Sequence, residues 1–138
     1  MDARPIRPGM AIAAAFACAT LAGCMPAERP DRTEWSNAPP ARVTGPPVNC
    51  VRIAQFNSTR VRDDRTIDFM RDSRRGWRNT LPYSCPGLAV QNAFTYKTST
   101  SELCSVDIIH VLETAGGLSR GAGCGLGQFV PIELERRR

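Results

Sequence analysis

Two alternating segments and two turn signals lie in residues 59–81, TRVRDDRTIDFMRDSRRGWRNTL. In the middle of this stretch, Ile67 and Phe69 point to one face of an extended chain, and polar residues alternate with them. Acidic and small residues at 63–64 and 72–76 are typical of turns between such segments. The stretch therefore predicts an antiparallel meander of short strands with polar loops.

Further strands are expected on both sides of the meander. They are residues 51–56, 93–97, 105–113 and 128–134. The segment 105–113 is apolar on both faces, which favours a central strand, with a short helix as the alternative. Because proline cannot donate to a ladder, Pro131 predicts an edge or a bulge for the last strand. The fold class predicted is mainly β, a small antiparallel rolled sheet or barrel-like domain of about six strands.

The N-terminus, residues 1–23, has the order of a bacterial lipoprotein signal peptide. Arg4 and Arg7 precede an apolar run, residues 10–22, that is too short to span a membrane. The run ends in Leu-Ala-Gly-Cys at 21–24, which is typical of a lipobox. We expect Cys24 to carry a diacylglycerol on its thiol and a further acyl chain, such as palmitate, on its amine, which together give stable anchoring.

Three segments follow the signal peptide. Residues 24–47 hold six prolines and no apolar periodicity, which predicts a Pro-rich tether. Residues 48–134 are the small β domain, and residues 135–138 are a basic tail. Residue 25 is Met where Asp would favour retention at the inner membrane, so we expect anchoring in the outer membrane, facing the periplasm.

Six cysteines divide into two groups. Cys18 leaves with the signal peptide and Cys24 is assigned to lipid, so four remain in the domain. These are Cys50, Cys85, Cys104 and Cys124. An even number in an exported domain predicts two disulfides, and they would stabilise a domain this small. Three pairings are open, with a preference for Cys85–Cys104 and Cys50–Cys124. Because no two cysteines lie close in sequence, a zinc or thioredoxin-like site is disfavoured, and no metal or cofactor is predicted.

The chain of 138 residues has a net charge of +5, and Lys97 is its only lysine. Eight arginines lie between residues 52 and 78. Candidate contacts to an anionic surface are Arg71, Arg74, Arg75 and Arg78. A solubilising surface explains the same charges, and the expected compartment makes nucleic acid an unexpected partner.

Other candidate chemistry has simpler structural explanations. His110, the only histidine, has no adjacent Ser or Cys nucleophile motif and is interpreted as a packed or edge residue. The carboxylates Asp64 and Asp68 allow hydrolysis as a hypothesis, but a solvated charge is the favoured interpretation of both. The alternating glycines of residues 121–127 lack the spacing of a phosphate loop and indicate close backbone packing.

Several short segments of the domain form a recognisable set. They are residues 64–69, 78–82, 85–88, 94–96, 103–109 and 124–131. Together they resemble a family of small exported proteobacterial proteins that is classed as a domain of unknown function, over about residues 50–132. The resemblance implies a disulfide-bonded exported domain and carries no activity or catalytic residue with it.

The sequence thus favours a binding or structural module of the envelope, without catalytic residues. Its expected partners are the membrane, reached through the lipid anchor, and an envelope protein or an anionic lipid. The alternatives are an envelope hydrolase that uses carboxylates near Asp64 and Asp68, and a binder of anionic lipid or glycolipid through the arginine-rich strands.

Overall fold

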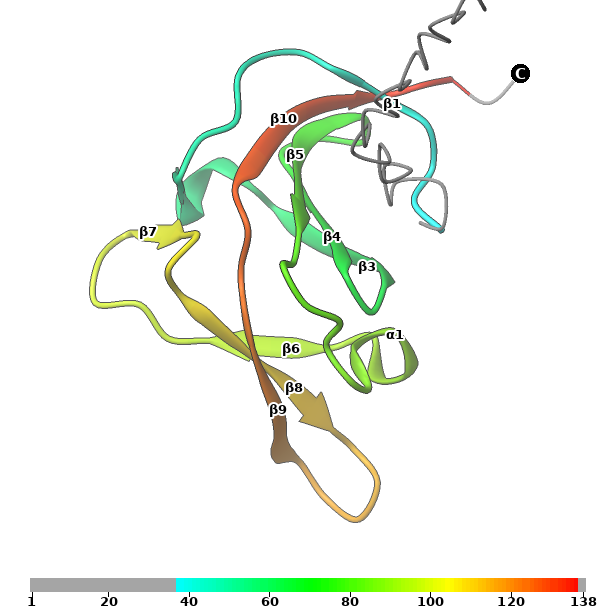
Figure 1. Ribbon diagram of the computed structural model, residues 1–138, viewed down its shortest axis with the longest axis vertical. Helices are drawn as coiled ribbons and strands as arrows, with labels where there is room; N and C mark the ends of the chain where they lie inside the picture. Colours follow the sequence, from blue (N-terminus) through cyan, green and yellow to red (C-terminus); the bar gives the residue numbers. More distant parts are fainter. Residues whose placement is uncertain (1–36, 137–138) are drawn as a thin grey trace, which may run out of the picture.

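The computed structural model describes residues 37–136, which form ten strands in three antiparallel sheets and one short α-helix. The fold is mainly β, as the alternating segments predict. The sheets stay open at their edges, so the described residues form no closed barrel (Figure 1). There are ten strands where about six are predicted, and several of the ten are only three residues long.

The largest sheet has the strand order β1-β10-β5-β4-β3. Its strands are Ala41–Val43, Phe129–Leu134, Arg75–Thr80, Thr66–Met70 and Ser58–Asp63, in that order. The predicted meander is confirmed, because β3, β4 and β5 pair in sequence and in antiparallel register. All five residues of β4 are buried. The sheet is therefore covered on both faces around its central strand.

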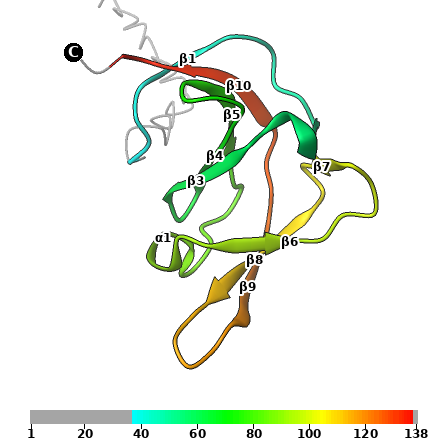
Figure 2. The same ribbon diagram turned by 180° about the vertical axis from the view of Figure 1, so that it is seen from behind.

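Two smaller sheets complete the domain. One has the order β6-β8-β9, with strands Phe94–Tyr96, Ile108–Glu113 and Ser119–Gly125. The other pairs β2, Cys50–Arg52, with β7, Glu102–Cys104. The central strand predicted in residues 105–113 is confirmed, since β8 pairs on both sides. In both views the β8–β9 hairpin lies at the end of the domain remote from β1 (Figure 2).

Two segments differ from their predictions. Residues 51–56 do not continue as one strand, because β2 ends at Arg52 and a 3-10 turn, η2, follows over Ile53–Gln55. Residues 121–127, a glycine-rich segment that falls between the predicted strands 105–113 and 128–134, lie mostly in a strand, because β9 runs to Gly125. Glycines have low strand propensity, so the pattern of side chains hides this strand, and its pairing with β8 forms it.

The last part of the Pro-rich segment belongs to the sheet. Residues 41–43, assigned by composition to the tether, pair with β10 as an edge strand. As a result β10 lies between β1 and β5, and the expectation of an edge position for Pro131 is wrong. Pro131 is tolerated in this inner strand because it lies opposite Thr44, just beyond the end of β1. The carbonyl of Pro131 accepts a hydrogen bond from the Thr44 amide at 2.9 Å.

The main core lies between the five-stranded sheet and the smaller sheets. Phe69 of β4 is fully buried at its centre. Its ring meets three other phenylalanines edge to face, with centroid distances of 5.1, 5.3 and 6.2 Å to Phe56, Phe129 and Phe94. The helix α1, Leu88–Gln91, closes this core with the buried Leu88. The prediction that Ile67 and Phe69 share a core face is confirmed.

Candidate binding site on the three-stranded sheet

The lipidation site, Cys24, and the signal peptide lie outside the residues that the structure describes. The same holds for tether residues 24–36. Among residues 37–136, no helix is long and apolar enough to cross a membrane.

All four domain cysteines form disulfides, as predicted, but in a different pairing. The bonds are Cys50–Cys104 and Cys85–Cys124, so the preferred Cys85–Cys104 and Cys50–Cys124 pairing is wrong. Strand register decides the pairing: Cys50 in β2 lies directly opposite Cys104 in β7. Cys85, fully buried after the connection from β5, instead meets Cys124 on the core face of β9.

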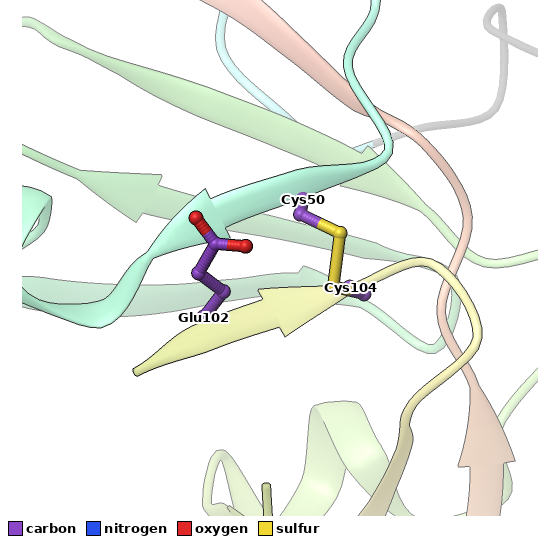
Figure 3. A group of neighbouring side chains, drawn as sticks. All are labelled: Cys50, Glu102 and Cys104. Atoms are coloured by element: carbon purple, nitrogen blue, oxygen red, sulfur yellow. A yellow bond between two sulfur atoms is a disulfide. The ribbon is translucent and has the colours of Figure 1, made fainter. Parts of the chain in front are cut away.

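One group of potential metal ligands lies at the first of these disulfides. The side chains of Cys50, Glu102 and Cys104 bring their ligand atoms within 4.8 Å of one another (Figure 3). The two sulfurs are bonded to each other, so no thiolate is left to bind a cation. Glu102 remains, and it pairs with Arg52 at 3.8 Å. In the oxidised protein this group is a disulfide beside a surface ion pair.

The two carboxylates considered for hydrolysis have structural partners. The Asp68 side chain is fully buried, so its interpretation as a solvated charge is wrong. It accepts hydrogen bonds from Arg62 at 2.8 Å and from Arg78 at 2.7 and 3.1 Å. Asp64 accepts the amide of Ala89 at 2.8 Å at the start of α1. Both carboxylates therefore take part in hydrogen bonds that hold the domain together.

Most of the four arginines considered for anionic contacts are engaged within the domain. Arg78 binds Asp68 and the carbonyl of Pro39, and Arg74 pairs with Glu133 at 2.9 Å. Arg75 pairs with Asp72 at 2.9 Å, and the amides of Arg74 and Arg75 lower the pKa of Asp72 to about 2. Within residues 37–136, Arg71 alone of the four makes no ion pair or side-chain hydrogen bond, so three of these arginines already have partners inside the domain.

A different group of cations surrounds a shallow depression on the three-stranded sheet. The cavity has a volume of about 350 Å³. Its lining residues are Thr95, Tyr96, Lys97, Val106, Asp107, Ile108, His110 and Arg120. It is built from the end of β6, the turn before β8, and the outer face of β8 and β9. Thr95, His110 and Gly123 lie in register across this face.

An irregularity in β9 places Arg120 at this site. The β8–β9 register shifts between His110 and Leu112, so Arg120 lies opposite Leu112 and shares a face with His110. Lys97 follows β6 directly. The sequence predicts a packed or edge position for His110 and does not indicate a functional role for Lys97 or Arg120. Two features of the sequence could have indicated this site: the single lysine, Lys97, and the alternating glycines of β9.

The glycines of β9 give the depression its depth. A Cβ atom at Gly123 would lie 3.1 Å from His110 Cε1 and 3.3 Å from Nδ1, so the imidazole lies against the bare backbone. A Cβ at Gly121 would meet the Glu113 carboxylate in the same way. Close packing is therefore present at Gly121 and Gly123, but against side chains and not against backbone as predicted, and nothing lies within 4 Å of the Cβ position at Gly125.

Comparison of the chain with protein-family models, with curated proteins and with solved structures finds no match.

Proposed function

We propose that this protein is an envelope lipoprotein, anchored through Cys24 in the outer membrane, whose domain is a non-catalytic binding module in the periplasm. The observation that carries the proposal is the use of cysteine. Every cysteine after Cys24 is joined in a disulfide, and such bonds persist in oxidising compartments such as the periplasm. The lipobox at residues 21–24 supplies the matching export and anchoring signal.

Binding is favoured over hydrolysis by the roles of the carboxylates. Asp68 neutralises two arginines inside the sheet, and Asp64 binds the first turn of α1. The depression on the three-stranded sheet, in contrast, holds side chains with free donors. Three of its lining residues, Ile108, His110 and Arg120, come from the β8–β9 hairpin, which lies remote from β1, the first strand of the described chain (Figure 1). A domain joined to its anchor near β1 would present this depression away from the attachment point.

The anchor is tested by fractionation of cells that express the full chain or a cysteine variant. We expect the wild-type protein to stay with membranes after a wash at 1 M salt, where the Debye length is about 3 Å and electrostatic binding is lost. Cys24→Ser should move to the soluble periplasmic fraction or remain as an uncleaved precursor. Cys18→Ser, the matched control in the same apolar run, should behave as wild type.

Two results would contradict the proposal. Salt-resistant membrane association of a Cys24→Ser chain from which the signal peptide has been cleaved would show that Cys24 does not carry the anchor. Release of the wild-type protein by salt would favour the alternative of an electrostatic binder of anionic lipid.

A further inference from the structure

Three basic side chains converge on the depression without partners of their own. Lys97, His110 and Arg120 enter none of the ion pairs or side-chain hydrogen bonds that join the described residues. Asp107, the one carboxylate of the lining, accepts the Cys104 amide at 2.7 Å through Oδ2. In contrast, six arginines of the described chain pair with a carboxylate: Arg42, Arg52, Arg62, Arg74, Arg75 and Arg78.

Two apolar side chains also line the depression. Val106 and Ile108 line it with exposed fractions of 85% and 54%. An apolar side chain so exposed is ordinary by itself, but here two lie beside three unpaired basic groups. The hydroxyl-bearing residues Thr95 and Tyr96 complete the lining. At about 350 Å³ the cavity falls within the range of small-molecule sites, roughly 300–1,000 Å³.

We propose that this depression binds a small anion, a phosphate or carboxylate that bears a short apolar substituent. Lys97 and Arg120 bind the charged group, His110 donates to it from the floor, and Val106 and Ile108 contact the apolar part. The inference rests on the proposed function, because it assigns a ligand class to the binding module. The same chemistry occurs in a free organic phosphate and in a phospholipid headgroup.

Gly123 of β9 contributes to the shape of the depression. A Cβ atom at Gly123 would lie 3.1 Å from His110 Cε1, so the ring would have to shift away from the strand by a few tenths of an ångström. Gly123 therefore keeps the imidazole low against the strand, with space for a ligand above it. A basic surface that only contacts water would not require a glycine beneath the imidazole.

The test uses the single histidine of the chain as a reporter. The ring signals of His110 are unique in an NMR spectrum of the full-length protein, purified from membranes in non-ionic detergent. Inorganic phosphate, hexyl phosphate and hexanoate are titrated at constant pH and ionic strength. We expect a saturable shift of the His110 ring signals, with hexyl phosphate binding more tightly than inorganic phosphate. Monomeric dihexanoyl phosphatidylglycerol, compared with hexyl phosphate, distinguishes a lipid headgroup from a free ligand.

Variants locate the site. Lys97→Gln and Arg120→Gln should each weaken hexyl phosphate binding about tenfold, since charge-assisted hydrogen bonds are lost. Arg71→Gln, which removes an exposed arginine of the turn between β4 and β5, should leave the dissociation constant unchanged. The Lys97 and Arg120 side chains have no partners among the described residues, so thermal unfolding of these variants should match wild type.

The proposal is overturned by a linear, non-saturating shift, or by saturable binding that both Lys97→Gln and Arg120→Gln retain at full strength. This outcome is separate from failure of the anchor. A protein that lacks acyl chains yet titrates as expected refutes the proposed anchoring alone. An acylated protein that does not titrate refutes the anion site alone.

Discussion

Asp68 is buried, although its neighbours in the sequence predict an exposed carboxylate. Arginines and a turn surround it in sequence, which is typical of a solvated charge. In the sheet it lies between Arg60 on β3 and Arg78 on β5, on the face covered by Pro39 and its neighbours. Residues 37–40 are far away in sequence, so alternation alone could not predict this burial. The carboxylate is buried because two arginines and their hydrogen bonds compensate its charge.

Substitution of Asp68 should therefore affect stability. Asp68→Asn keeps the shape but leaves Arg62 and Arg78 without a counter-charge, and removal of one partner of a buried ion pair costs about 3–5 kcal/mol. Urea unfolding of the oxidised protein measures this loss. Glu102→Gln is the control, because its pair with Arg52 is exposed and should contribute less than about 1 kcal/mol. An Asp68→Asn change as small as the control's would contradict the structural role.

At the scale of strands, side-chain alternation predicted only part of the fold. The β3-β4-β5 meander was predictable because apolar residues alternate between acidic turns. In contrast, β9 was missed because glycines at 121, 123 and 125 leave no alternation to recognise. Likewise, β1 was hidden by the prolines around it, and its pairing with β10 depends on residues about 90 positions away. Long-range register also decided the cysteine pairing.

The connection from β9 to β10 depends on one buried amide. Asn79 of β5 is fully buried; its Nδ2 donates to the Gly127 carbonyl at 2.7 Å and its Oδ1 accepts the Gly127 amide at 2.9 Å. A Cβ at Gly127 would lie 2.2 Å from the Thr80 carbonyl oxygen, so glycine is required for this approach. The side chain thereby replaces a missing stretch of strand pairing.

Asn79→Ala should lower the free energy of unfolding by about 2–3 kcal/mol, because the half-buried amide and carbonyl of Gly127 both lose their partner. Chemical denaturation, followed by circular dichroism, measures the change. Gln128→Ala is the matched control: its amide binds Asn49 at the surface, and its loss should cost less than about 0.5 kcal/mol. Equal stability of Asn79→Ala and wild type would show that water replaces the side chain.

At the scale of the whole molecule, two disulfides stabilise a domain whose core is small. Cys50–Cys104 closes a separation of 54 residues within the β2–β7 sheet, and Cys85–Cys124 closes one of 39 residues between the β5 connection and β9. Loops of this size stabilise a folded chain by about 4 kcal/mol each in the chain-entropy model. The number of disulfides followed from the even cysteine count, whereas their pairing needed the strand register.

The candidate site belongs to this scale as well. Lys97, His110 and Arg120 come from three segments, and only the β6-β8-β9 pairing brings them to one depression. In sequence each is an isolated basic residue. The proposed anchor, in contrast, rests on a local sequence pattern in residues 1–24, and its prediction needs no knowledge of the fold.

The central claim, an acylated and doubly disulfide-bonded envelope module, is tested most directly by mass spectrometry of the protein isolated from its own membranes. We predict a 115-residue chain that begins at acylated Cys24, with four further thiols that appear only after reduction. Non-reduced peptide maps should join Cys50 to Cys104 and Cys85 to Cys124. A mass without acyl chains would contradict the anchor, and thiols that react before reduction would contradict the oxidised, exported domain.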